Sequence, residues 1–200
     1  MTRIKICGVT RPEDVRACLE LGVDAIGFNL ARGPRKLTIE RAAELVALVP
    51  PPVCPVLLVA DARADDILDW LRRTRCQAVQ LHGAEPAELA ARLRARLPVI
   101  KAFAMRGAED LATAAGYPCD VALLDSGAGG TGTAWDHRLL AGRDLGKPVM
   151  LAGGLTADNV AAAIAALRPW AVDTAGGVES TPGIKDRAHI ARFVAACRDR

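Results

Sequence analysis

Two Gly-Gly pairs stand near the C-terminal end of the chain, each directly after an apolar segment. They lie in Leu151-Ala152-Gly153-Gly154-Leu155 and in Thr174-Ala175-Gly176-Gly177-Val178. Because glycine has no side chain, its backbone N–H group can approach an anion closely, and the amino end of a following helix adds partial positive charge. If the two turns lie side by side, we expect these four glycines to clamp a phosphate group.

A cysteine and an aspartate carry groups that could move protons beside such a phosphate. Cys7 precedes Gly8 at the end of an apolar segment, and Lys5 on the same strand face favours its thiolate form. Asp125 ends the apolar segment 121–124, where a carboxylate without a task is costly. We therefore expect acid–base chemistry from this pair; a buried apolar role for Cys7 and a turn-capping role for Asp125 remain the alternatives.

Further polar residues end or follow apolar segments. Arg35 lies in a basic turn and has the planar guanidinium that suits a substrate carboxylate, unless the turn is only solvated. His82 is either a site residue or a histidine satisfied within the core. We expect Lys5, Lys101 and Asp173 to form an ion-paired layer inside the fold rather than to catalyse. His82 and Asp173 are kept as candidates for contact with the substrate.

The segment 126–132 contains a G-x-G-x-x-G pattern, which by itself suggests a dinucleotide site. The context argues against that interpretation, because the segment follows a middle strand, the helix behind it is weak and no acidic residue stands at the expected distance. A loop that folds over a small phosphorylated substrate fits better. We expect Gly130 and Gly132 to contact the phosphate.

Short apolar segments alternate with Ala-, Leu-, Arg- and Glu-rich stretches along the chain, which predicts repeated βα units. The strands are almost continuously apolar, as is typical of parallel strands covered by helices. We expect strands at 4–7, 25–29, 53–59, 78–82, 99–103, 121–125, 149–152 and 171–174. Helices are expected to begin near Pro12, Thr38, Ala64, Glu85, Ala108, Trp135, Ala157 and Asp186.

Eight such units predict one α/β domain over residues 1–200, a single (β/α)8 TIM barrel of the phosphate-binding type. An open doubly wound sheet is the alternative. Because strand side chains alternate between two faces, one polar residue from each of several units is expected to point to the barrel axis. These pairs share a face: Lys5 with Cys7, Gln80 with His82, Lys101 with Phe103, Asp125 with Leu123, and Asp173 with Ala171.

Net charge, cysteine spacing and the lengths of the apolar runs indicate which kinds of partner and which cellular compartment to expect. The net charge of +3 is too small and too evenly spread for a nucleic-acid surface. The six cysteines form no C-x-x-C pair, which favours reduced thiols over disulfides or zinc. The N-terminal segment shows no apolar signal region, and no apolar run is long enough to cross a bilayer. We expect a cytoplasmic protein that binds neither metal, nucleic acid nor membrane.

A series of short motifs makes the sequence similar to a known enzyme family. In chain order they are Lys5-Ile6-Cys7-Gly8-Val9-Thr10, Gly27-Phe28-Asn29, Pro34-Arg35, Val79-Gln80-Leu81-His82-Gly83, Ile100-Lys101-Ala102, Leu123-Leu124-Asp125, Gly129-Gly130-Thr131-Gly132, Leu151-Ala152-Gly153-Gly154-Leu155, Gly177-Val178-Glu179 and Pro182-Gly183-Ile184-Lys185-Asp186. They cover essentially the whole chain. Together they resemble phosphoribosylanthranilate isomerase.

The resemblance implies a (βα)8 barrel of tryptophan biosynthesis. It implies conversion of N-(5-phosphoribosyl)anthranilate to 1-(2-carboxyphenylamino)-1-deoxyribulose 5-phosphate, an Amadori rearrangement without cofactor or metal. By resemblance, Cys7 matches the general base, Asp125 the general acid and Arg35 the residue that holds the anthranilate carboxylate. The glycine turns match the phosphate site. The expected partner is this small phosphorylated substrate, and the chain is expected to be a monomer or a homodimer.

The sequence departs from the family pattern at two places. Gly176 stands where the family often has a serine, so a hydroxyl contact to the phosphate is missing and backbone N–H groups are expected to do more. Gly33 and Lys36 flank the Pro34-Arg35 pair, where serine or lysine and an aromatic residue are common. This second departure bears on the shape of the anthranilate pocket.

Other phosphate-binding proteins remain as alternatives. Sugar-phosphate epimerases tend to carry metal-ligating histidines on several strands, whereas only His82 ends a strand here. The related histidine-pathway isomerase usually has aspartate at the position of Cys7. A non-catalytic phosphate binder would keep the glycine turns but would not need Cys7 and Asp125 together.

Overall fold

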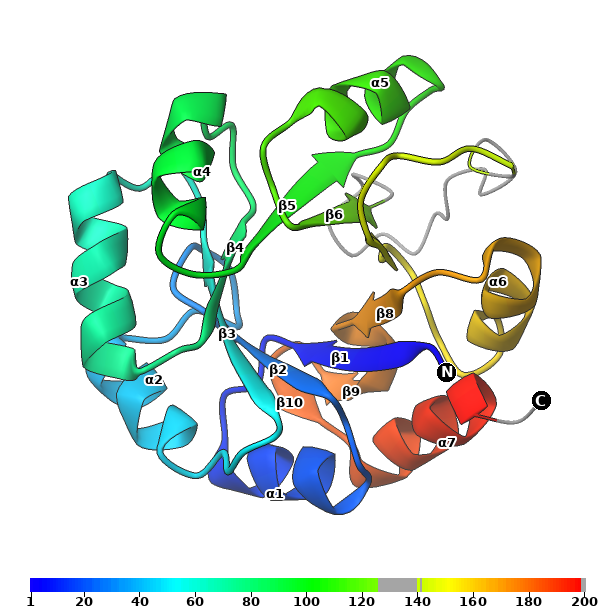
Figure 1. The fold of residues 1–200 in the computed structure, drawn as a ribbon. Coiled ribbons are helices and arrows are strands. Elements are labelled where there is room, and N and C mark those ends of the chain that lie inside the picture. The colour runs from blue at the N-terminus through cyan, green and yellow to red at the C-terminus, as the bar shows by residue number, and fades with distance from the viewer. Residues whose placement is uncertain (126–139, 141, 199–200) are drawn as a thin grey trace.

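In the computed structural model, eight parallel strands close into a barrel, and the helices form a ring outside it (Figure 1). The structure describes residues 1–125, 140 and 142–198. The strands follow one another around the barrel in chain order, and β1 pairs with β8, which excludes the open sheet. Their bounds are β1 Arg3–Cys7, β2 Ala25–Asn29, β3 Cys54–Val59, β4 Ala78–Leu81, β5 Val99–Ala104, β6 Val121–Asp125, β7 Val149–Leu151 and β8 Ala171–Thr174.

Seven helices lie within the described residues. They are α1 Pro12–Glu20, α2 Ile39–Val46, α3 Ala64–Thr74, α4 Ala87–Arg94, α5 Glu109–Gly116, α6 Val160–Leu167 and α7 Arg187–Arg198. The side chain of Thr38 caps α2 by accepting a hydrogen bond from the Arg41 N–H, and Pro12 takes the first turn of α1, where no backbone donor is needed. The helix expected near Trp135 falls outside the described residues.

The segment between β8 and α7 contains structure that was not predicted from the sequence, although α7 begins next to Asp186, as expected. A short 3-10 turn, η2 Gly176–Val178, leads into an antiparallel hairpin of β9 Glu179–Thr181 and β10 Ile184–Lys185, and α7 begins only after it. Two contacts hold this hairpin to the loop after β1: the Thr10 hydroxyl donates to the Gly183 carbonyl at 2.6 Å, and Arg11 Nη2 donates to the Lys185 carbonyl at 3.0 Å. The hairpin is therefore fixed beside the end of β1.

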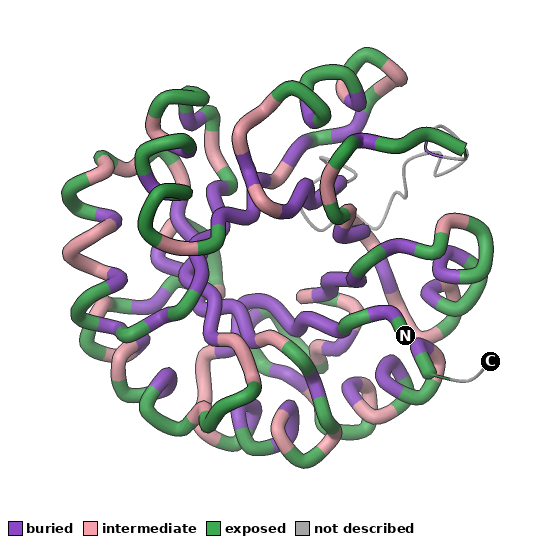
Figure 2. Tube along the Cα trace, in the orientation of Figure 1, coloured by how far each residue is buried: buried purple, intermediate pink, exposed green. Residues whose placement is uncertain are grey.

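The core has two apolar layers. The larger lies between strands and helices, and the smaller fills the barrel interior with aliphatic residues of β3 to β8, such as Val56, Leu123 and Met150. Figure 2 shows the result as buried segments along the strands and exposed segments on the outer sides of the helices. Among the described helices, none combines the length and the apolar character needed to cross a membrane.

Lys101 does not join a layer inside the barrel, so that expectation is wrong. Ile100 packs in the barrel interior, whereas Phe103 packs in the outer layer. Lys101 therefore points outward, and its Nζ atom donates to Glu85 Oε2 at 2.8 Å and to the Gly83 carbonyl at 2.6 Å. The reason is packing: the barrel interior takes the aliphatic face of β5, and the buried cation finds its carboxylate in the loop after β4.

Candidate active site

The carboxyl ends of the strands carry the residues predicted to do chemistry. Cys7 ends β1, Asp125 ends β6 and His82 follows β4, so all three stand at the same rim of the barrel. Leu123 packs in the barrel interior, and Asp125, two residues later, shares its face. Because β7 and β8 separate β6 from β1, Asp125 and Cys7 come from different parts of the rim.

A buried ion pair lies next to Cys7. Lys5 shares the inward face of β1, and its Nζ atom is 2.9 Å from Oδ1 of Asp173 on β8, with both side chains buried. This confirms the expected pairing of Lys5 with Asp173. Burial opposes the ammonium, but the charges and hydrogen bonds of Asp173 and Cys7 together outweigh it and hold the pKa of Lys5 above its ordinary value. Lys5 is thus a cation beside the thiol.

Burial and the neighbouring lysine charges shift the pKa of the Cys7 thiol in opposite directions. Burial raises its pKa above the ordinary value of 9.0, and Asp173 adds to that rise, whereas the charges of Lys5 and Lys185 oppose it. Lys5 acts in the expected direction, but burial outweighs it. A Cβ atom placed on Gly27 of β2 would lie 2.8 Å from Cys7 Sγ. The sulfur therefore has its space only because residue 27 has no side chain.

His82 lies at the rim with its ring oriented by a neighbour. Gln80 Nε2 lies 3.1 Å from His82 Nδ1, and both residues come from the inward face of the β4 segment, as expected. Desolvation by the surrounding protein lowers the pKa of His82; Lys5 and Lys101 act in the same direction, while Asp125 and Asp173 oppose them. His82 is therefore a neutral imidazole within electrostatic reach of Asp125 and Asp173.

The two glycine turns lie side by side. A Cβ atom on Gly177 would lie 2.0 Å from the carbonyl oxygen of Leu155 in the first turn, so only glycine allows this approach. The Thr174 hydroxyl donates to the same carbonyl at 2.7 Å. In the first turn, Gly153 and Gly154 have φ values of 84° and 71°, the left-handed region that glycine adopts without strain. This proximity is the arrangement that a phosphate clamp requires.

Arg35 reaches the same region but is engaged within the protein. Its Nε and Nη2 atoms donate to Oε1 and Oε2 of Glu179 at 2.7 and 2.6 Å, a bidentate pair. A Cβ on Gly176 would lie 3.6 Å from Arg35 Nη2, so the guanidinium borders the second glycine turn. A Cβ on Gly8 would lie 2.4 Å from Arg35 Cδ, so the turn after Cys7 packs closely on the stem of this arginine.

Two residues of this network were not singled out from the sequence as site residues. Glu179 holds Arg35, and Lys185 Nζ donates to Glu179 Oε1 at 2.8 Å and to the backbone carbonyls of Cys7 and Ala175 at 2.6 and 3.0 Å. The only signal in the sequence was their place in the motifs after Gly177. Their partners are distant in the chain, so local pattern could not reveal the contacts.

Some expectations fall outside what the structure describes. Gly130 and Gly132 lie in the segment 126–139, which is not described. Within the described residues, no group of three or more His, Cys, Asp or Glu side chains is arranged to hold a metal ion.

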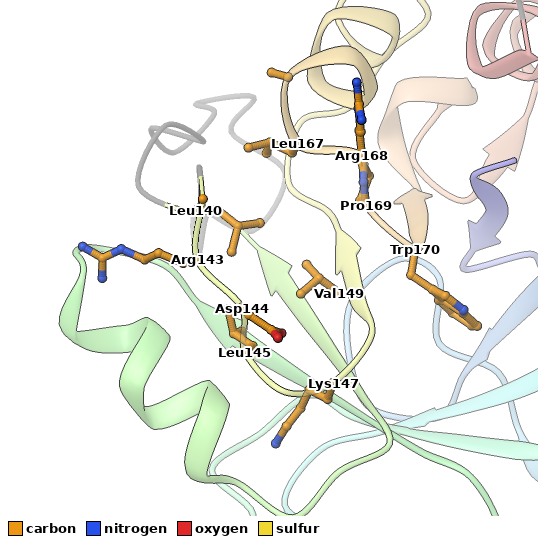
Figure 3. Close-up of a pocket in the computed structure, with 12 residues that line it drawn as sticks. Leu140, Arg143, Asp144, Leu145, Lys147, Val149, Leu167, Arg168, Pro169 and Trp170 are labelled. Carbon is orange, nitrogen blue, oxygen red and sulfur yellow. The ribbon is translucent and has the colours of Figure 1, made fainter.

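A hollow of about 250 Å³ lies at the end of the barrel opposite this rim (Figure 3). Val149, which begins β7, and Trp170, which precedes β8, line it together with Arg143 and Arg168. Of the predicted site residues that the structure describes, none lines this hollow. Barrel enzymes keep their chemistry at the carboxyl ends of the strands, so we assign the site to the rim with Cys7 and not to this hollow.

Comparison with known proteins gives consistent matches over nearly the whole chain. A family model described as N-(5'-phosphoribosyl)anthranilate (PRA) isomerase matches residues 4–196. The N-(5'-phosphoribosyl)anthranilate isomerase of Pseudomonas paraeruginosa is 44% identical over 205 residues, covering 99% of this chain and 96% of the relative. The phosphoribosyl anthranilate isomerase structure from Thermotoga maritima has a TM-score of 0.94 and 37% identity and covers 99% of both chains.

One further solved structure contains a ligand. It is a phosphoribosyl anthranilate isomerase in complex with reduced 1-(o-carboxyphenylamino)-1-deoxyribulose 5-phosphate. Its TM-score with this chain is 0.91 at 36% identity, and the match covers 99% of both chains.

Proposed function

We propose that this chain, which belongs to the N-(5'-phosphoribosyl)anthranilate isomerase family, works with Cys7 as general base and Asp125 as general acid. The reaction is the isomerisation of N-(5'-phosphoribosyl)anthranilate in tryptophan biosynthesis. The observation that carries this assignment is the placement of these two side chains on one rim, together with the paired glycine turns. A sugar phosphate held at the turns would extend across the barrel mouth between them. The ligand of the related complex, a carboxyphenylamino-deoxyribulose phosphate, carries a phosphate and a carboxylate, the two groups for which the glycine turns and Arg35 are proposed.

The first chemical step is opening of the ribose ring. Asp125 donates a proton to the ring oxygen as the bond from that oxygen to C1 breaks, and the nitrogen lone pair forms a cationic imine at C1. This role requires Asp125 to hold a proton in the complex.

The second step removes the proton from C2 of the opened sugar. The Cys7 thiolate takes that proton, the electron pair moves to neutralise the imine, and the resulting enolamine tautomerises to the ketone product. Burial raises the pKa of Cys7, so the thiolate needs help. Lys5 provides part of it, and the cationic imine of the substrate adds to it when it lies beside the sulfur.

Binding is assigned to the residues around these two groups. We propose that Gly153, Gly154, Gly176 and Gly177 hold the phosphate through backbone N–H groups, and that Gly130 and Gly132 add further contacts to it. Arg35 is proposed to hold the anthranilate carboxylate: its pair with Glu179 engages Nε and Nη2, and Nη1 is not part of that pair. His82 and Asp173 remain candidates for contact with the sugar.

Several broader properties are proposed on the sequence alone. We propose one domain over residues 1–200, in the cytoplasm, acting without metal, cofactor, nucleic acid or membrane. The related Thermotoga maritima enzyme is dimeric, and monomers of it have been made. For this chain we propose either a monomer or a homodimer, which sedimentation of the purified protein distinguishes.

The test is turnover of phosphoribosylanthranilate by the purified chain, followed by the loss of substrate fluorescence. Because proton transfer by a positioned group is typically worth about 10²–10⁴-fold, Cys7→Ala and Asp125→Asn should each lower kcat by that order with modest changes in KM. Cys76→Ala is the matched control, because Cys76 is a buried thiol in the outer apolar layer. Wild-type kcat in either site variant would remove the assigned role, and an inactive wild type would point to a non-catalytic phosphate binder.

A further inference from the structure

A buried lysine that the proposed mechanism does not use lies directly behind the base. Lys185 belongs to β10, its residue is 3% exposed and its side chain is fully buried. Building on the proposed function, we propose that Lys185 is a positioning residue that fixes the Cys7 end of β1 relative to the second glycine turn and to Arg35.

The ammonium group of Lys185 has three oxygen acceptors. Its Nζ atom lies 2.6 Å from the Cys7 carbonyl, 3.0 Å from the Ala175 carbonyl and 2.8 Å from Glu179 Oε1. None of these oxygens can donate a hydrogen bond, so the arrangement fits an ammonium that gives one N–H to each of them. Removing this ammonium would leave two backbone carbonyls and a carboxylate without their buried donor.

Each acceptor belongs to a different part of the site. The Cys7 carbonyl ends the strand that presents the thiol, and the Ala175 carbonyl directly precedes Gly176 in the second glycine turn. Glu179 is the carboxylate that grips Arg35 in a bidentate pair. One cation therefore connects the base, the second glycine turn and Arg35. In the proposed function these three parts contact C2 of the sugar, the phosphate and the anthranilate carboxylate, respectively.

The hairpin that delivers Lys185 is itself held in place. Gly183 at its turn has φ of 88°, and its carbonyl accepts from the Thr10 hydroxyl at 2.6 Å. Arg11 pairs with Asp14 and also donates to the Lys185 carbonyl at 3.0 Å. Figure 1 shows β9 and β10 close to β1 and α1. Lys185 therefore contacts Cys7 from a hairpin that hydrogen bonds hold in place.

Charge supports the same role. The charged groups that act on the Cys7 thiol are Lys5 from its own strand, Asp173 from β8, Lys185 from β10 and Arg35 from the loop after β2. Lys185 opposes the rise that burial causes in the pKa of Cys7. Its ammonium therefore favours the thiolate as well as holding the backbone that carries it.

The experiment compares Lys185→Met with Lys147→Met. Lys147 donates to the Ala114 and Tyr117 carbonyls on the opposite side of the barrel, so its loss also removes an ammonium from backbone acceptors. Stability, kcat, KM and the affinity for inorganic phosphate are measured well below the melting temperature of each variant. Because misplacement of about 1 Å can cost about 10²-fold, Lys185→Met is expected to lower kcat/KM by about that factor, with kcat falling and KM rising, and to weaken phosphate binding about tenfold. Lys147→Met is expected to keep kcat, KM and the affinity for inorganic phosphate within about twofold of the wild-type values.

The outcomes separate positioning from a purely structural role. A folded Lys185→Met with wild-type kcat, KM and phosphate affinity overturns the proposal. If that variant does not fold, Lys185→Gln, which keeps amide donors, takes its place under the same criteria; failure of both to fold while Lys147→Met folds also overturns it. If the wild type does not turn over phosphoribosylanthranilate, the proposed function fails, whereas the phosphate affinities still decide the role of Lys185.

Discussion

Lys5 and Asp173 stand directly opposite each other where β1 pairs with β8, and their side chains meet at 2.9 Å. This ion pair crosses the seam that closes the barrel. It also lies beside the proposed general base, because Cys7 follows two residues later on the same face of β1. Closure of the barrel and the electrostatic surroundings of the thiol therefore depend on the same contact.

The first prediction concerns this pair. Lys5→Met leaves the Asp173 carboxylate buried without its partner, so it should lower the free energy of unfolding by about 3–5 kcal/mol. The double variant Lys5→Met/Asp173→Leu removes both charges and should recover most of that loss. Urea unfolding at pH 7 measures both. A double variant as unstable as the sum of two single variants would show that the pair is not coupled in this way.

Gly27 is predicted to be needed for the position of the thiol. In Gly27→Ala the new Cβ would lie 2.8 Å from Cys7 Sγ and 3.3 Å from Lys5 Nζ, so the sulfur must move. We expect kcat to fall at least about tenfold, since the base then approaches C2 of the sugar in the wrong geometry. Gly116→Ala is the control, because nothing lies within 4 Å of a Cβ there. Steady-state kinetics decides, and an unchanged kcat in Gly27→Ala would contradict the packing argument.

The contact between the two glycine turns gives the third prediction. Gly177→Ala places a Cβ 2.0 Å from the Leu155 carbonyl oxygen, so the turns must separate. KM and the dissociation constant for inorganic phosphate should both rise about tenfold or more. Gly176→Ala in the same turn meets only Arg35 Nη2 at 3.6 Å and should have a smaller effect. Titration calorimetry with phosphate compares the two, and equal effects would argue against the clamp.

The carboxylate of Glu179 should make stability depend on pH. Burial works against its charge, but the hydrogen bonds and charges of Arg35 and Lys185 outweigh it and hold the pKa of Glu179 below its ordinary value of 4.5. A carboxyl group whose pKa is lower in the folded state stabilises the fold above its unfolded pKa and loses that effect as pH falls through the folded value. The free-energy difference between wild type and Glu179→Gln should therefore be large at pH 7 and shrink below pH 4.5.

Urea unfolding at pH 7 and at an acidic pH measures that difference. Glu44→Gln is the control, because Glu44 pairs with Arg41 on the exposed surface, where ion pairs contribute little. A difference that stays constant across the acidic range would mean that the charge of Glu179 does not stabilise the fold.

The alternation of apolar segments in the sequence was enough to predict the barrel and the faces of most strands. Lys5, Cys7, Asp125 and Asp173 take the inward positions that a two-residue period assigns them. The same rule was wrong for Lys101, because the residues on both sides of it are apolar and the pattern alone does not say which face of β5 fills the barrel. Packing decided that choice in favour of Ile100 and Ala102.

The sequence predicted that Lys5 pairs with Asp173, but it did not predict the partners of Arg35 and Lys185. Arg35 meets Glu179 across 144 residues, and Lys185 meets the Cys7 carbonyl across 178 residues. The sequence alone determined residue types and strand faces, because side-chain alternation and turn chemistry are local properties of the chain. Only the tertiary structure decided the partners of Arg35 and Lys185, because folding the β9–β10 hairpin beside the end of β1 creates contacts that have no local signature.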